Sequence, residues 1–230
     1  MSIPENPNTM VIQNVFYPGG LTEGQVWKHY QKYKTQIVKE INKRPVMFFI
    51  YRELNEKPII KRKLYNSPIV LVPGNYDRFI TGRTVSIAVE QLDRTKELII
   101  DIDPGPSATE NEIKQCVENV LKSSVSKLPT VINHRVISTS KGFHVYFILK
   151  TAMNINSARV ILIKLLTMDF GNKYTINKKS PSGSIIDLDL TPTTHRGVHQ
   201  VPFALTRNGL VSMDVTKNLN SFNRRSAIIK

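Results

Sequence analysis

The sequence lacks the features that would cross-link the chain or anchor it in a membrane. Its one cysteine, Cys116, can form neither an internal disulfide nor a cysteine-rich zinc site, and we expect it to be a small core residue on a helix. No apolar run approaches the roughly 20 residues of a membrane span. The N-terminal MSIPENPNTM does not have the basic and then apolar layout of a signal peptide. We therefore expect an intracellular protein, in the cytoplasm, a nucleoid or a viral replication site, that is not secreted and has no membrane partner.

Acidic residues are scarce beside the basic ones. The chain has 32 lysines and arginines against 18 aspartates and glutamates, a formal net charge of +14 over 230 residues. An excess of this size favours a polyanionic partner, with nucleic acid ahead of an anionic membrane surface. Hydrophobic residues make up 40% of the chain, which is enough for a packed core and argues against disorder.

The hydrophobic pattern predicts an α+β fold. Capping boxes at Thr22–Gln25 and Thr109–Glu112 begin two helices, and a third helix is expected at about 156–168. Apolar runs predict strands over residues 46–52, 84–91, 97–103 and 184–190, and a hairpin over 134–149. The basic stretch from Gly171 to Gly183 is expected to be an exposed loop. We expect an antiparallel sheet to carry the polar motifs.

Two pairs of aspartates stand on apolar strands. In LIIDIDPG, Asp101 and Asp103 are two residues apart and therefore project from one face of the strand. In SIIDLDL, Asp187 and Asp189 have the same spacing. Neighbouring carboxylates repel one another, and a divalent cation with a preference for oxygen ligands, Mg²⁺ or Mn²⁺, relieves that repulsion. The alternatives are a solvated strand end for the first pair and ion pairs with nearby Arg or Lys for the second.

The turn of the predicted hairpin, STSKGFHVYF, offers groups that bind phosphate. Ser138, Ser140 and Lys141 supply hydroxyls, backbone N–H groups and an ammonium, and His144 opens the following strand. A lone histidine at such a position is more often structural, but its place after the Ser-Lys turn favours contact with a ligand. Further along, Arg196 and Arg207 could recognise phosphate through their planar guanidinium groups, although as isolated residues they read as surface charges.

The order of these motifs resembles the catalytic core of archaeo-eukaryotic primases. It looks closest to the polymerase domain of bacterial ligase D and to stand-alone primase-polymerases of prokaryotic end joining. The resemblance extends from about residue 13 to 222 and rests on the following segments: VFYPGGLTEGQVWKHYQKY, NKRPV, LIIDIDPG, STSKGFHVY, YTINKKSPSGSIIDLD and HRG with ALTRNGL. It implies a single primase-polymerase catalytic domain over 1–230, with an N-terminal lobe of about 1–90 and a catalytic RRM-like sheet of about 91–222 flanked by helices.

The resemblance also implies roles for individual residues. Asp101, Asp103 and Asp187 would hold two Mn²⁺ or Mg²⁺ ions; Asp187 directly follows the apolar run, as the family's third acid does, and Asp189 is the alternative. The residues that match nucleotide-binding positions are Ser138, Ser140, Lys141, His144 and Arg207. The basic residues expected to follow a template-primer backbone are Lys173, Lys178, Lys179 and Arg196. Two positions depart from the family pattern: Thr139 replaces a glycine of the turn, and Ala88 stands where ligase D relatives have a histidine.

The implied activity is template-dependent addition of NTPs or dNTPs to a 3′-hydroxyl, in replication priming or break repair. The expected partners are a DNA or RNA template-primer, nucleoside triphosphates and a ligase, helicase or end-binding protein. Two other functions remain open. A non-catalytic nucleic-acid-binding protein would not need converging carboxylates, and a two-metal nuclease would not need the Ser-Lys-Gly-x-His turn.

Overall fold

The structure is a computed structural model that describes residues 16–17, 20–51, 57–177 and 186–229. It contains two compact units, each described below by itself. The first comprises residues 1–89, 200–212 and 227–230, and the second comprises residues 90–199 and 213–226. The single catalytic domain with a lobe and a sheet, as expected from the sequence, stays a prediction.

The first unit combines two helices with a four-stranded sheet. Helix α1 (Glu23–Lys32) begins at the expected capping box, where Thr22 Oγ1 accepts a hydrogen bond from the Gln25 N–H at 3.2 Å. Helix α2 (Lys34–Ile41) follows. The sheet has the order β13-β7-β3-β4, and its strands are β3 (Val46–Ile50), β4 (Ile59–Lys61), β7 (Thr84–Glu90) and β13 (Val198–Gln200). By the bounds above, Glu90 of β7 and Val198 and His199 of β13 are counted with the second unit. The smaller elements are β1 (Phe16–Tyr17), β2 (Leu21–Thr22), β5 (Lys63–Leu64), β6 (Ser67–Pro68), η2 (Pro73–Asn75) and α3 (Tyr76–Phe79).

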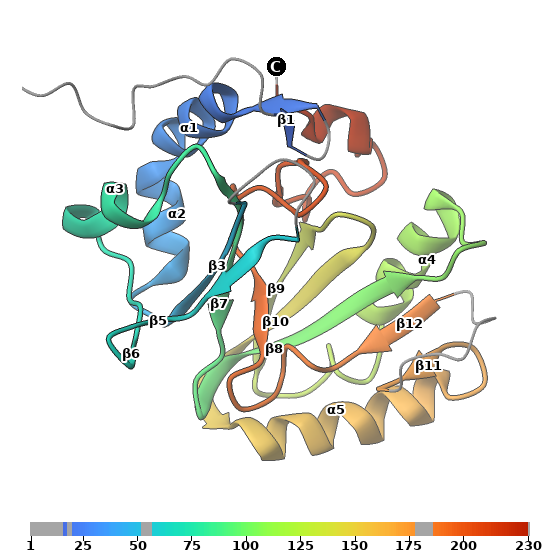
Figure 1. The fold of residues 1–230 in the computed structure, drawn as a ribbon. Helices are drawn as coiled ribbons and strands as arrows, with labels where there is room; N and C mark the ends of the chain where they lie inside the picture. The colour runs from blue at the N-terminus through green and yellow to red at the C-terminus, as the bar shows by residue number, and fades with distance from the viewer. Residues whose placement is uncertain (1–15, 18–19, 52–56, 178–185, 230) are drawn as a thin grey trace, which may run out of the picture. The chain divides into compact units, whose positions relative to one another are not determined.

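The second unit is built on a five-stranded sheet with the order β11-β12-β8-β10-β9 (Figure 1). Its strands are β8 (Arg94–Pro104), β9 (Val131–Ser138), β10 (Phe143–Asn154), β11 (Thr175–Ile176) and β12 (Ile186–Asp189). The connections run through α4 (Glu110–Leu121) and α5 (Ile155–Phe170), and a short helical turn, η3 (Arg224–Ala227), lies near the end of the chain. Neighbouring strands are antiparallel except for β11 and β12. The expected α+β class with antiparallel sheets is confirmed.

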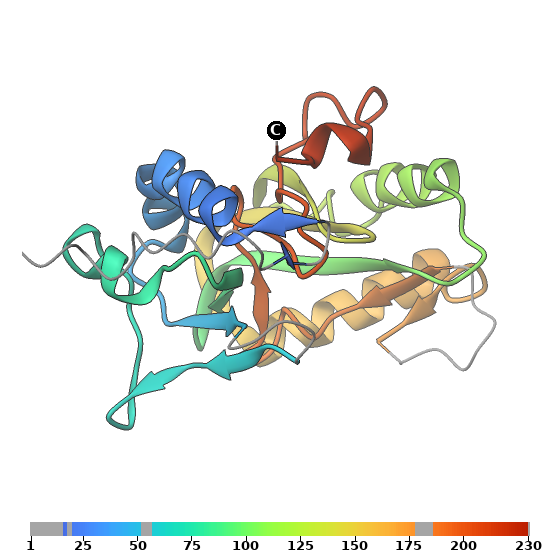
Figure 2. The same cartoon turned by 45° about the horizontal axis from the view of Figure 1, so that its top comes forward.

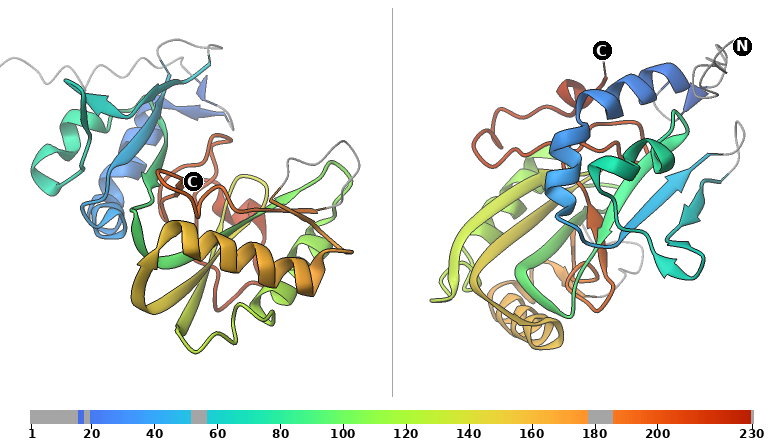
Figure 3. Two further views of the ribbon diagram at one scale, coloured as in Figure 1. Left: turned by 90° about the horizontal axis from the view of Figure 1, so that it is seen from below. Right: turned by 90° about the vertical axis from the view of Figure 1, so that its left-hand side faces the viewer.

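Alternation along the central strand β8 separates its two faces. Leu98, Ile100 and Ile102 are completely buried, whereas Asp101 and Asp103, which alternate with them, reach solvent to different degrees. Helices α4 and α5 both pack against β8 and β10 (Figure 3). The four apolar residues of α4 that are buried include Cys116, in agreement with the expected core cysteine. The apolar face of β8 therefore carries the core, and the other face is available for the acids.

One expectation about the loop at 171–183 is wrong in part. Thr175 and Ile176 form β11, which pairs in parallel with Asp187 and Leu188 of β12. The tertiary structure overrides the polar sequence because these two residues extend the sheet at an edge strand. Residues 178–183 lie outside the described part of the chain. Within that part, no helix is both long and apolar enough to cross a membrane.

Candidate active site

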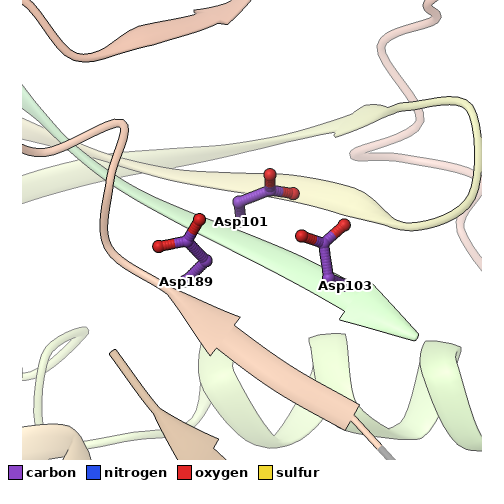
Figure 4. A group of neighbouring side chains, drawn as sticks. All are labelled: Asp101, Asp103 and Asp189. Carbon is purple, nitrogen blue, oxygen red and sulfur yellow. The ribbon is translucent and has the colours of Figure 1, made fainter. Parts of the chain in front are cut away.

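Four aspartates lie on one face of the second unit's sheet, on the adjacent strands β8 and β12. The antiparallel register places Asp189 opposite Asp101 and Asp187 opposite Asp103. Cross-strand partners share a face, and their side chains stand about 5 Å apart. Carboxylate oxygens of Asp101, Asp103 and Asp189 lie within 4.8 Å of one another, and the three side chains converge in Figure 4. The two sequence pairs therefore meet as a single acidic cluster.

The structure groups the alternative acid, Asp189, with the first pair. Asp189 Oδ1 already accepts hydrogen bonds from the Thr191 N–H at 2.8 Å and from its hydroxyl at 2.7 Å. These contacts fix the orientation of the carboxylate at the end of β12. Asp187 stands one register position further along and is close enough to Asp103 to raise the pKa of that carboxyl. The role of Asp187 as third ligand stays a prediction.

His144 flanks the cluster from the neighbouring strand β10. It pairs in register with Asp101, and its Nε2 lies 3.2 Å from Asp101 Oδ1. Burial lowers the pKa of His144, but the charges of Asp101, Asp103 and Asp189 together raise it above its ordinary value. A protonated imidazole would offset part of the negative charge beside Asp101. The predicted phosphate ligand thus lies next to the predicted metal ligands.

The buried oxygen of Asp101 tests whether the cluster fits a cation. Among the described residues, Asp101 Oδ1 accepts no hydrogen bond, and its separation from His144 does not have hydrogen-bond alignment. A buried carboxylate oxygen without a donor is costly. A divalent cation held by three carboxylates would satisfy this oxygen, and such hard oxygen ligands suit Mg²⁺ or Mn²⁺. The residues present therefore fit the expected metal.

Repulsion within the cluster changes the protonation of Asp103. Burial, followed by the charge of Asp101, raises the pKa of Asp103 to about 6, although His144 acts in the opposite direction. Without metal, folding therefore favours the protonated form of Asp103. The contribution of this group to stability is fully present below its unfolded-state pKa near 4. This stability is lost as the pH rises through about 6.

Asp103→Asn is therefore expected to stabilise the metal-free protein. The gain at pH 7.5 should be about 1 kcal/mol, because the residue as a whole is exposed although neighbouring groups crowd its carboxyl, so solvent screens part of the repulsion. The gain should disappear near pH 4. Urea unfolding in EDTA at both pH values measures the difference. Added Mn²⁺ should stabilise the wild type more than the variant.

A matched control is Asp214→Asn in the same unit. Burial raises the pKa of Asp214, but hydrogen bonds from Thr216 and the ion pair with Arg135 lower it more, so the net shift is downward. This substitution should destabilise the protein at pH 7.5. A loss of stability for Asp103→Asn as large as that for Asp214→Asn would contradict the proposed repulsion.

The turn between β9 and β10 is closed by its own side chains and backbone. The Thr139 N–H donates to the Gly142 carbonyl at 3.0 Å, and Thr139 Oγ1 accepts from the Gly142 N–H at 3.1 Å. The threonine that departs from the family pattern thus closes the turn. Ser140 is half-buried and Lys141 exposed, so both can reach a ligand from the turn. Their proposed contact with phosphate stays a prediction.

The sheet does not bring Ser138 to the acidic cluster. Ser138 pairs in register with Phe143, whose side chain alternates with that of His144, so Ser138 belongs to the other face. The side chain is buried, and its Oγ accepts a hydrogen bond from the Met213 N–H at 2.9 Å. This contact joins the end of β9 to the C-terminal segment at Met213. Its assignment as a nucleotide ligand is untested.

Sequence reasoning missed Arg224, which fastens the turn to α4. Its guanidinium donates to the Thr139 carbonyl at 2.9 Å and to the Gly142 carbonyl at 3.2 Å. Its Nε lies 2.9 Å from Glu110 Oε2, and its charge lies 4.9 Å from the centre of the Phe143 ring. Arg224 is distant from the turn in sequence and belongs to none of the motifs, so no local signal identifies it.

Of the remaining basic candidates, Arg196 and Lys173 lie in turns. In the second unit, Arg196 is exposed in the turn after β12 and has a left-handed backbone (φ 54°). Lys173 is exposed, with Nζ 5.3 Å from the centre of the Tyr174 ring. Lys178 and Lys179 lie outside the described residues. Their contacts with nucleic acid stay predictions.

Arg207 belongs to the first unit and is described there by itself. It lies on a turn that is closed by a hydrogen bond from the Thr206 N–H to the Leu210 carbonyl at 2.7 Å. Its guanidinium carbon stands 4.1 Å from the centre of the Phe49 ring on β3. The stacking orients an exposed guanidinium. Ala88, at the position where relatives have a histidine, is buried in β7 of the same unit.

Comparison with known structures shows the fold. The polymerase domain of ligase D from Mycobacterium tuberculosis, solved in complex with DNA, aligns with this chain with a TM-score of 0.70. The alignment covers 87% of this chain and 83% of that chain, at 14% sequence identity. No protein-family model and no curated protein matches the sequence. The similarity expected from the ordered motifs is thus confirmed at the level of the fold.

Proposed function

We propose that this protein is a metal-dependent nucleotidyltransferase of the primase-polymerase type. It adds NTPs or dNTPs to the 3′-hydroxyl of a template-primer. The observation that carries the proposal is the group of Asp101, Asp103 and Asp189, whose carboxylate oxygens lie within 4.8 Å of one another and include one buried oxygen without a donor. The fold shared with a polymerase domain and the excess of positive charge support it.

The proposed reaction is attack of the strand's 3′-hydroxyl on the α-phosphate of the triphosphate, with release of pyrophosphate. Asp101, Asp103 and either Asp189 or Asp187 would hold Mg²⁺ or Mn²⁺. The chemistry supplied by two such ions is activation of the attacking oxygen and stabilisation of the leaving group. His144 moderates the charge beside Asp101, to which it lies within 3.2 Å.

The phosphates of the incoming nucleotide would lie against the turn between β9 and β10. Lys141 is exposed there and contributes an ammonium, and Ser140 contributes a hydroxyl. The resemblance also assigns Arg207 of the first unit to the triphosphate, and its guanidinium lies over the Phe49 ring. The template-primer backbone would be bound by basic side chains such as Lys173 and Arg196.

A primer-extension assay tests the proposal. Purified protein is incubated with labelled DNA and Mn²⁺ or Mg²⁺, with NTPs or dNTPs, and with or without a primer. Templated extension is the expected result. Products without primer would identify a primase, and a preference for NTPs at a gap with a 5′-phosphate would indicate end joining. Failure to extend with either metal, in protein that still binds DNA tightly, would overturn the proposal.

A further inference from the structure

The hairpin formed by β5 and β6 presents a tyrosine to solvent in the first unit. Lys63 pairs with Pro68 and Leu64 with Ser67, so Tyr65 and Asn66 form a two-residue turn. Both have left-handed backbones, with φ of 49° and 66°. Tyr65 is 88% exposed, more than any other large hydrophobic residue in the described part of the chain. Figure 2 shows the hairpin extending from the neighbouring strands of its unit.

No contact within the described part of the chain explains a tyrosine at this position. A two-residue turn with positive φ at both positions favours Asn-Gly or Asp-Gly, and a bulky side chain there is strained. Among the described residues, Tyr65 makes no hydrogen bond or ring contact, and its ring remains in water. Because no contact within the described residues offsets the backbone strain at Tyr65, we infer that the side chain contacts a molecule outside the chain.

The sequence around Tyr65 is rich in basic residues. The sequence from Lys57 to Tyr76 contains no acidic residue, and the exposed cations before the turn are Lys57, Lys61, Arg62 and Lys63. Lys63 is exposed on β5, two residues before Tyr65 in the sequence. The preceding strand β4 lies at an edge of its sheet, and Ile60 on it is 55% exposed. An exposed ring flanked by cations matches the way that proteins bind single-stranded nucleic acid, by stacking on bases and pairing with phosphates.

We propose that the β5–β6 hairpin binds single-stranded nucleic acid, with Tyr65 stacked on an unpaired base and Lys63 beside a phosphate. The hairpin would thus contact an unpaired part of the strand, a contact that the acidic cluster does not provide. The proposal deepens the proposed function by naming a surface for its nucleic-acid partner. An acidic protein could also meet the cations, but it would not need a stacking ring on a strained turn.

Binding of a labelled 12-nucleotide oligo(dT) to the full chain, followed by fluorescence anisotropy, tests the proposal. Tyr65→Gly should weaken binding about tenfold, because it removes the stacked ring. The same change should leave the urea midpoint unchanged or raise it, because glycine suits the left-handed turn. Tyr65→Trp should retain the affinity, and its fluorescence should be quenched by the oligonucleotide.

The salt dependence separates the lysine from the tyrosine. Lys63→Gln should reduce the slope of log affinity against log salt concentration by about 0.7, whereas Tyr65→Gly should leave the slope unchanged. Lys150→Gln, an exposed lysine on the second unit, is the matched control and should bind as the wild type does. Wild-type affinity for Tyr65→Gly would overturn the proposal.

These outcomes are distinct from failure of the proposed function. Binding of the oligonucleotide requires no nucleotide addition, so it can be measured whether or not the protein extends primers. If the wild type extends primers but Tyr65→Gly binds normally, the hairpin proposal alone is wrong. If the wild type extends nothing but Tyr65→Gly weakens binding, the hairpin proposal stands and the enzymatic one does not.

Discussion

Asp101→Asn is expected to lower the rate of nucleotide addition at least about 1,000-fold. Asp101 lies between His144 and Asp189 in the sheet, with a cross-strand partner on each side. The amide preserves the shape of the side chain but removes the charge that would hold a cation. A factor of 1,000 corresponds to about 4 kcal/mol of lost transition-state stabilisation, and removal of a metal ligand is expected to cost several kcal/mol.

The measurement is the initial rate of primer extension at saturating DNA and nucleotide. Asp93→Asn is the matched control, because it makes the same chemical change on an exposed aspartate of the same unit, which is paired with His195. The control should retain most of the activity, and both variants should bind DNA. Urea unfolding checks that Asp101→Asn, which also removes a charge that raises the pKa of Asp103, is still folded. Equal activity of the two variants would show that Asp101 is not a metal ligand.

Gly142→Ala is expected to destabilise the protein by about 3 kcal/mol and to impair activity. A β-carbon on Gly142 would lie 1.7 Å from the Ile102 carbonyl oxygen and 2.9 Å from its carbon, and backbone cannot give way as a flexible side chain can. Ile102 lies between Asp101 and Asp103, so relief of the clash would part β8 from β10 at the acidic cluster. Overpacking commonly costs about 1–3 kcal/mol, and a clash with backbone falls at the upper end.

Urea unfolding and Mn²⁺-dependent stabilisation measure the two consequences for Gly142→Ala. Gly74→Ala is the control, because a β-carbon there would meet no heavy atom within 4 Å. That change should alter stability by less than about 1 kcal/mol. Wild-type stability for Gly142→Ala would mean that β8 and β10 do not approach each other as closely as described.

Local sequence rules were sufficient for much of this architecture. The capping boxes at Thr22 and Thr109 predicted the starts of α1 and α4, because the cap and its partner lie three residues apart. Asp101 and Asp103 share a face because residues two apart in a strand always do. The hairpin through the Ser-Thr-Ser-Lys-Gly turn was also predictable, since both strands and the turn are continuous in sequence.

Contacts between distant segments were not predictable in this way. The register of β12 against β8 decides which second acid faces Asp101. It groups Asp189 with the first pair, although the resemblance favoured Asp187, which directly follows the apolar run. Similarly, Ser138 reads as a ligand in the motif, but its pairing with Phe143 directs it to the other face of the sheet. A shift of β9 by one residue would move Ser138 to the face that carries the acids, and a shift of β12 by two residues would place Asp187 opposite Asp101.

The sequence by itself determined the α+β class, the two acidic pairs, the Ser-Thr-Ser-Lys-Gly turn and the positive charge, because each depends on residue type and local spacing. Only the tertiary structure decided that the two pairs meet, that Asp101 Oδ1 is buried without a donor and that Arg224 fastens the turn. Those features depend on strand register and on packing between segments up to 114 residues apart. Such contacts arise only when the whole chain has folded, so no local pattern records them.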